Sequence, residues 1–139
     1  MAHHTRFEIF IPIAFRKTQR DPQTGEPLLH PVTGDVQKEK KSLDESLLRE
    51  FINETCAKYE GLTQANPLAP ALYKGWWQKD PKEAIEIDYL TFLFGLVRID
   101  QSDEALTFFT TWKRRFEKEL EQNVVLVVYF PVQTIGDFF

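Results

Sequence analysis

The sequence has one cysteine, three histidines and no long apolar run, and each scarcity excludes a class of protein. A single cysteine, Cys56, cannot form an internal disulfide, so we expect a protein of the reducing cytoplasm. No stretch approaches the roughly 18 apolar residues that a membrane-spanning helix requires. The first residues also lack the apolar segment of a secretory signal. We therefore expect no membrane partner.

Phosphate-binding motifs are also absent, since the chain contains neither GxxxxGK[ST] nor GxGxxG. The formal net charge of −4 gives no overall attraction to nucleic acid. Basic residues bracket the segment 17–41, but the aromatic and glycine pattern with which sheet proteins stack RNA bases is missing. Nucleic acid is therefore not an expected partner, and no cofactor is expected.

Side chains suited to catalysis or metal binding are few. Two histidines lie near the N-terminus, and the third, His30, lies in a loop with no second histidine at ligand spacing. Cys56 falls on the apolar side of a predicted helix, which is typical of a buried, unreactive thiol. Glu86 and Asp88 share one strand face, a spacing that can hold Mg²⁺ or Ca²⁺, but a solvated strand end explains them as well. We predict no catalytic residue and no metal site.

Hydrophobic periodicity predicts four strands and two helices within a single domain spanning residues 1–139. The strands are expected at residues 7–15, 73–78, 85–99 and 124–130. One helix is expected to start at a capping box formed by Ser42 and Glu45, and the other at Asp100 or Ser102. Pro12 or Gly95 marks a bulge or kink. Residues 133–139 form a tail.

Residues 17–41 interrupt this pattern with two similar turns nine residues apart. The turns are Pro22-Gln23-Thr24-Gly25 and Pro31-Val32-Thr33-Gly34, each with proline second and glycine closing. We interpret the segment as an excursion outside the core sheet, shaped as a small hairpin. The similarity of the two turns reflects shared turn chemistry rather than a repeat architecture, which needs three or more stacked units.

The order strand, helix, strand, strand, helix, strand resembles the ferredoxin-like, split βαβ arrangement. The resemblance covers roughly residues 6–132 without the excursion, and concerns element order and burial pattern only. It implies an α+β fold with a four-stranded antiparallel sheet, in which the last, first, third and second strands lie side by side. It also implies that both helices pack on one face. Such a fold hosts many activities and implies none by itself.

Both faces of the expected sheet are apolar, although the helices cover only one. We expect the second face to be an interface formed by Phe10, Ala14, Phe92, Phe94, Val125, Val127 and Tyr129. Phe92 and Phe94 should matter most, because they lie on a central strand. The cover is a second copy of the chain, another protein, or the excursion folded back.

Two functions follow from this surplus apolar face. The preferred one is a non-catalytic assembly or binding module that forms a homo-oligomer, most simply a dimer, or docks to another protein. The alternative is a small cofactor-independent enzyme of the dimeric α/β-barrel type, with a cavity between paired sheets. The side chains best placed to bind a ligand there are Arg16, Trp76, Trp77 and Arg98.

Overall fold

The computed structural model describes residues 3–59, 61–64, 73–78, 81–82, 86–121 and 125–135. Within them the strands are β1 (His4–Thr18), β2 (Lys38–Ser42), β3 (Thr63–Gln64), β4 (Tyr73–Trp77), β5 (Glu86–Arg98) and β6 (Leu126–Val132). The helices are α1 (Glu45–Tyr59) and α2 (Ser102–Leu120), and the 3-10 turn η1 (Ile99–Gln101) precedes α2. The chain is mixed α+β, as the sequence predicts.

The sheet is antiparallel at every described strand pair, and β1 lies in its middle. β5 pairs with one edge of β1. On the other edge, β6 pairs with the first part of β1 and β2 with its last part. β4 and β3 pair with the edge of β5 that faces away from β1. The four expected strands appear in the expected order, β6–β1–β5–β4, but the sheet has six strands rather than four. Hydrophobic periodicity does not predict β2 because its sequence is Lys-Glu-Lys-Lys-Ser. It does not predict β3 because that strand has only two residues.

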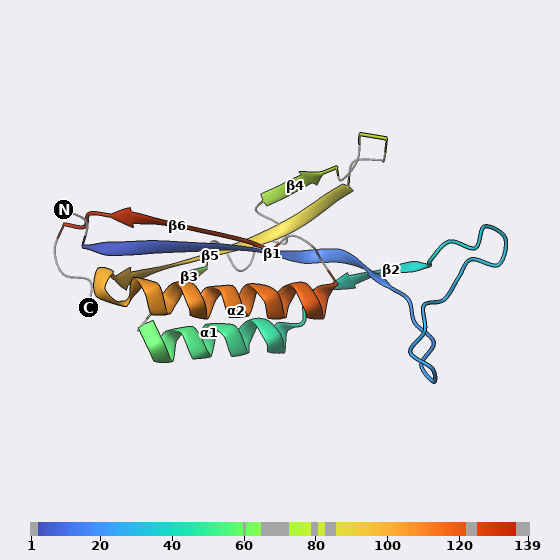
Figure 1. Ribbon diagram of the computed structural model, residues 1–139, viewed down its shortest axis with the longest axis horizontal. Helices are drawn as coiled ribbons and strands as arrows, with labels where there is room; N and C mark the ends of the chain where they lie inside the picture. The colour runs from blue at the N-terminus through green and yellow to red at the C-terminus, as the bar shows by residue number, and fades with distance from the viewer. Residues whose placement is uncertain are drawn as a thin grey trace.

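Both helices lie on one face of the sheet (Figure 1), with α2 along β1 and β6 and α1 against β5. The core between them and the sheet is rich in aromatic rings. Its strand residues are Phe7, Ile9, Ile11, Leu93 and Val97, and its helix residues include Phe51, Tyr59, Phe108, Phe109, Trp112 and Phe116. Neither α1 nor α2 is long and apolar enough to span a membrane.

The irregularity expected in the long strands lies in β1. The register between β1 and β5 shifts between Pro12 and Ala14, which fits a proline that has no N–H to donate to a neighbouring strand. The other candidate, Gly95, shows no register shift and pairs directly with Phe7. A Cβ at Gly95 would lie 3.4 Å from the backbone oxygen of Gly61, at the edge of ordinary van der Waals contact.

Both helix starts differ from the sequence prediction. Ser42 belongs to β2, so the expected capping box is wrong; the Asp44 carboxylate instead accepts bonds from the N–H and hydroxyl of Ser46, at 2.9 and 2.7 Å. These bonds lower the pKa of the Asp44 carboxyl. At α2, the Ser102 hydroxyl does not cap the helix but lies 2.6 Å from the Thr5 hydroxyl on β1.

Residues 19–37, here called the arm, hold two turns of the same construction. The Asp21 carboxylate accepts bonds from the N–H groups of residues 23 and 24, and His30 Nδ1 accepts from those of residues 32 and 33. Gly25 and Gly34 close the turns with φ of 74° and 75°, values that favour glycine. Both expected turns are therefore confirmed, and each takes its shape from its own hydrogen bonds.

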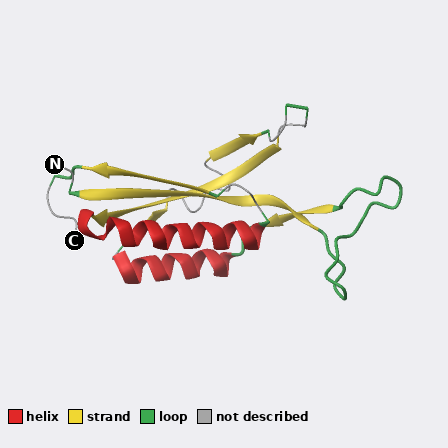
Figure 2. Cartoon of the chain, in the orientation of Figure 1, coloured by secondary structure: helices red, strands yellow, loops and turns green. Residues whose placement is uncertain are grey.

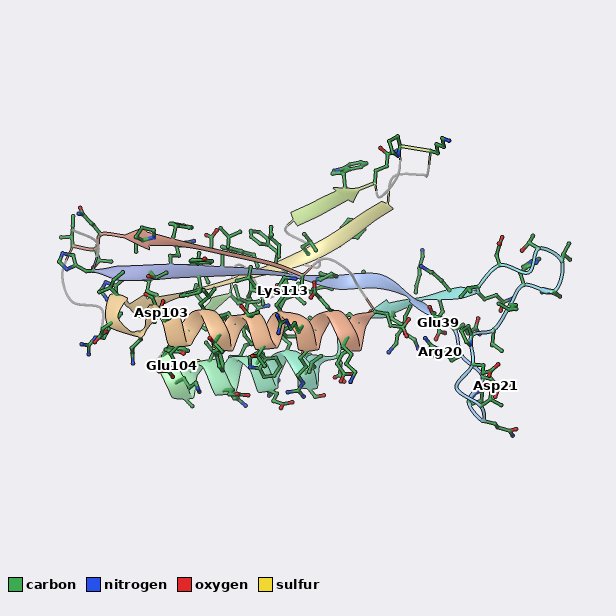
Figure 3. All side chains as sticks on the ribbon, in the orientation of Figure 1. Arg20, Asp21, Glu39, Asp103, Glu104 and Lys113 are labelled. Carbon is green, nitrogen blue, oxygen red and sulfur yellow. The ribbon has the colours of Figure 1, made fainter. Side chains whose placement is uncertain are left out.

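The arm joins the body of the protein at its base, next to the end of α2. The Glu121 carboxylate accepts bonds from the Thr18 N–H at 3.0 Å and from Arg20 Nε at 3.4 Å. Lys17 Nζ donates to the Glu119 carbonyl at 3.1 Å. Beyond this base the arm extends past the end of the helices as loop (Figure 2), and Figure 3 shows Arg20 and Asp21 on it.

Candidate protein interface

Three cross-strand rows make up the face of the sheet opposite the helices. Phe7, Ile9 and Ile11 are buried with the helices, so the even-numbered residues between them face the other way. Strand register then gives the rows Leu126–Phe10–Phe92, Val128–Glu8–Phe94 and Phe130–Arg6–Leu96. These nine residues are called the open face. Seven of them are apolar, so the expected second apolar face is present.

Aromatic rings and one ion pair organise the centre of the open face. The rings of Phe10 and Phe92 are tilted against each other with centroids 4.9 Å apart, and those of Phe92 and Phe94 stack at 5.8 Å. The Arg6 guanidinium lies 3.9 Å above the Phe94 ring, and its Nε donates to the Glu8 carboxylate at 2.9 Å. The two charges neutralise each other, so the apolar character of the face is kept.

Burial varies strongly across the open face. Phe92 is only 7% exposed, and the neighbouring Leu90 is 8% exposed. Leu126 and Phe130 on β6 are 44% and 37% exposed. The surface available to a partner therefore lies on the β6 side, with Phe10 on β1 partly buried next to it and Phe94 partly buried on β5.

Three of the predicted interface residues lie on the wrong face. Val127 and Tyr129 pair with Ile9 and Phe7 across the sheet, and the rings of Tyr129 and Phe7 stack at 5.7 Å, so both belong to the helix side. Val125 is 1% exposed within the core. Because side chains alternate along a strand, a shift of one residue exchanges the two faces completely.

Ala14 also lies outside the open face. It is exposed, follows the bulge, and pairs with Ser42 of β2 and Tyr89 of β5. Phe10, Phe92 and Phe94 are thus the predicted interface residues that the structure brings together. Their role in binding stays a prediction.

The four residues proposed to bind a ligand do not come together. Arg98 pairs with His4 at the start of β1, is exposed, and forms an ion pair with Asp100 at 3.3 Å. Arg16 lies near the other end of β1, roughly 40 Å away at about 3.3 Å per residue; its side chain is outside the described residues. Trp76, 60% exposed, lies on β4, which twists away from the helices with the start of β5 (Figure 1). The Trp77 side chain is not described.

The described residues hold no group of three histidine, cysteine or acidic side chains that could bind a metal ion. His30 Nδ1 accepts two backbone bonds within its own turn. Cys56 is exposed, so its expected burial is wrong. The buried stripe of α1 runs through Leu47, Phe51, Thr55 and Tyr59, and Thr55 satisfies its hydroxyl by donating to the Phe51 carbonyl at 2.7 Å.

Groups with a shifted pKa in the described residues are Asp44, Glu50, Tyr59, Arg115 and Glu121, and none belongs to the open face. At Glu121, partial burial acts to raise the carboxyl pKa, but bonds from Thr18 and Arg20 outweigh it and the pKa is lowered. This carboxylate therefore holds the base of the arm in its charged form. The shift has a structural cause and gives no sign of catalysis.

Sequence reasoning missed the most exposed members of the open face, Leu126 and Phe130, together with the Arg6–Glu8 pair. Both rows of β6 are apolar, so its periodicity does not show which row faces the helices. Two signals were available for Arg6 and Glu8. They are the only charged residues in β1 before Arg16, and they share a face with Phe10.

Comparison with known proteins gives no match: no family model fits the chain, and neither the curated proteins nor the solved structures include a similar one.

Proposed function

We propose that this chain is a non-catalytic assembly module that buries its open face against another protein chain, most simply a second copy. The observation that carries the proposal is the exposure of Leu126 and Phe130 on β6, next to Phe10 and Val128 of the open face, on a sheet whose other face packs against the helices. Contiguous exposed apolar side chains mark surfaces that bind proteins. The central Arg6–Glu8 pair adds no net charge that would oppose a second copy.

We further propose that the architecture is a ferredoxin-like core with two additions. The order β6–β1–β5–β4 and the placement of both helices on one face support this description. β2 follows the arm and lengthens the sheet beside the end of β1, while β3 adds a short pairing to β5. The single unpaired Cys56 suits a reducing cytoplasm, where we place the module.

An energetic comparison indicates how strong association through the open face can be. Complete burial of a leucine or phenylalanine side chain contributes about 1.5–3 kcal/mol. Leu126 and Phe130 are already more than half buried, so completing their burial adds roughly 1 kcal/mol each. Four such side chains in two copies add about 4 kcal/mol, the lower end of the roughly 4–15 kcal/mol that association costs. The partly exposed side chains of β6 therefore offset at most the lowest cost of association, and a stable dimer needs further buried apolar area.

The proposal is tested by light scattering behind a sizing column across the micromolar range. We expect wild type to show a concentration-dependent dimer, and the variant Leu126→Asp/Phe130→Asp to stay monomeric. The matched control is Ala57→Asp/Thr111→Asp, which adds the same charge at two exposed helix positions and should behave as wild type. Thermal unfolding followed by circular dichroism shows whether each variant is folded. A wild type that stays monomeric throughout would refute self-association.

The alternative, a small enzyme with a cavity between paired sheets, gains one specific observation. Glu8 lies within the open face, between Val128 and Phe94, so a face-to-face pair would enclose its carboxylate. A catalytic cavity needs such an ionisable group. A structure of the oligomer separates the two functions: a closed cavity bordered by Glu8 favours the enzyme, and direct packing of Phe130 and Leu126 favours the module.

A further inference from the structure

β6 is an edge strand whose exposed apolar side chains lie on both faces of the sheet. It pairs with β1 on one side, and no described strand pairs with its other side (Figure 1). Leu126 and Phe130 are exposed on the open face, while Tyr129, which is 53% exposed, lies on the helix side. A partner that lies on the open face alone would leave Tyr129 uncovered. A strand added to the edge of β6 would border both rows.

The same side of the sheet contains a second edge strand, β2, which differs from β6 in charge. β2 and β6 pair with successive parts of β1, so together they form one edge of the sheet. The sequence of β2 is Lys-Glu-Lys-Lys-Ser, and such charges prevent an edge from pairing with another chain. The sequence of β6 is Leu-Val-Val-Tyr-Phe-Pro-Val, which carries no charge. The part of this edge that is open to pairing is therefore β6.

The backbone groups of β6 alternate between β1 and the outer edge. The Ile99 N–H donates to the His3 carbonyl at 3.2 Å and continues the pairing of β5 with β1. Odd-numbered residues in this part of β1 therefore direct their backbone groups to β5, and even-numbered ones direct theirs to β6. The partners of those even-numbered residues on β6 are Leu126, Val128, Phe130 and Val132. The N–H and C=O groups of Val127 and Tyr129 consequently point outward.

Pro131 also faces outward and restricts the register in which a second strand can pair. Proline has no N–H, and its ring takes the place of the donor. An antiparallel copy centred on Tyr129 would bring this ring against the Val127 carbonyl. A copy centred on Val128 instead sets Val127 opposite Tyr129, and the two residues exchange N–H···O bonds. Pro131 then lies opposite Val125, which precedes β6 and donates its N–H to a glutamate carboxylate at 3.4 Å.

We infer that β6 pairs edge to edge with β6 of a second copy, antiparallel and centred on Val128, so that the two sheets become one. The inference rests on the proposed self-assembly and states how the copies join. On the open face, Leu126 then lies beside Phe130 of the second copy. On the helix side, Val127 lies beside Tyr129 of the second copy. Backbone hydrogen bonds and contacts on both faces thus add to the burial of the open face. The two-fold pair uses both β6 edges and is closed.

A cysteine on the two-fold axis tests the register. Residues of an antiparallel pair that lie on the axis have Cα atoms about 4.5 Å apart, a distance that a disulfide spans. Val128→Cys should therefore cross-link two copies when oxidised glutathione is added, in a Cys56→Ser background that removes the native thiol. Val132→Cys is the matched control, because its two copies lie roughly 27 Å apart. Equal cross-linking of the two variants, each folded by circular dichroism, overturns the register.

Amide hydrogen exchange of the wild-type protein, followed by two-dimensional NMR, gives the decisive result. Samples are compared below and above the concentration at which light scattering shows the dimer. The Val127 and Tyr129 N–H groups should exchange roughly tenfold or more slowly in the dimer, because an edge partner accepts bonds from them. The Val128 N–H points to β1 within one chain and is the internal control. A dimer in which Val127 and Tyr129 exchange as in the monomer overturns edge pairing and leaves the proposed function standing. A wild type that stays monomeric overturns both.

Discussion

Arg115 on α2 holds Glu50 on α1 through two parallel hydrogen bonds, Nη1 to Oε1 and Nη2 to Oε2, each 2.8 Å long. The same guanidinium lies 4.6 Å from the centre of the Trp112 ring. The bonds from Arg115 lower the pKa of the Glu50 carboxyl, and those to Glu50 raise the pKa of Arg115. One planar side chain thus joins the outer sides of the two helices and covers part of the core.

Replacing Arg115 by lysine should lower Tm by at most a few degrees at neutral pH. Lysine keeps the charge but has no planar pair of donors and stacks poorly on an indole ring. The pair is solvent-exposed, and exposed pairs contribute little. Arg114→Lys, one residue earlier and exposed, is the control and should leave Tm unchanged. Equal effects of the two substitutions would contradict this role of Arg115.

Acid should remove the difference in Tm between wild type and Arg115→Lys. The pKa of Glu50 is lower in the folded state than its ordinary value of 4.5, so the stabilisation is complete above that value. It is lost as pH falls through the folded-state pKa, when the carboxylate binds a proton. Thermal unfolding of both proteins at pH values on either side of this range measures the effect. A difference in Tm that stays constant into acid would show that the charge of Glu50 is irrelevant.

The sequence predicts the framework well because the framework depends on periodicity. Alternation in β1 and the spacing of apolar residues in α2 indicate which side chains share a face. The pairing of β1 with β5 and β6 follows from the burial that these strands require. Strand β2 could not be found this way, because its lysines bond through their backbone to the end of β1 and bury no apolar side chain. Its presence depends on chain connectivity.

The candidate interface was predicted only in part for a related reason. When both rows of a strand are apolar, alternation cannot say which row meets the helices, and the assignment of Val127 and Tyr129 was wrong. Phe10, Phe92 and Phe94 share the open face because they alternate with, or pair opposite, the row that contains Phe7 and Ile9; their role as an interface stays a prediction. Periodicity does not predict the exposed fraction of a side chain. The exposure of Leu126 and Phe130 is therefore known only from the structure.

Tyr59→Phe should keep or increase stability. The Tyr59 hydroxyl is buried and makes no hydrogen bond with the described residues, and burial, with a smaller contribution from Glu104, raises its pKa. Removing an unsatisfied buried hydroxyl should add about 1 kcal/mol to the free energy of unfolding. Urea denaturation measures this, with Tyr59→Leu as comparison because it also loses the ring contacts with Phe108 and Phe109. A loss in Tyr59→Phe would reveal a partner for the hydroxyl.

Replacing residues 20–37 by a short Gly/Ser linker should leave a folded domain. The ends of the deleted segment follow the pairing of Thr18 with Lys38, so a tight turn can connect them. The core residues all lie outside the segment, and the Thr18 bond to Glu121 is kept. Thermal unfolding should remain cooperative, with Tm close to that of wild type under conditions where both proteins are monomeric. Loss of cooperative unfolding would show that the arm supports the fold.

Phe92 and Leu126 lie in the same row of the open face but should respond differently to truncation. Phe92 is 7% exposed and its ring contacts those of Phe10 and Phe94 within one chain, so Phe92→Ala should lower the free energy of unfolding by about 3–5 kcal/mol. Leu126 is 44% exposed, and Leu126→Ala should cost the monomer about 1 kcal/mol or less.

The two effects separate when unfolding and association are measured on the same samples. Urea denaturation at low protein concentration reports the fold, and light scattering at high concentration reports the dimer. Phe92→Ala should lower the free energy of unfolding, and Leu126→Ala should mainly weaken dimerisation, because Phe92 is already covered before any partner binds. A Phe92→Ala protein with wild-type stability and lost association would place Phe92, rather than the β6 side, at the centre of the interface.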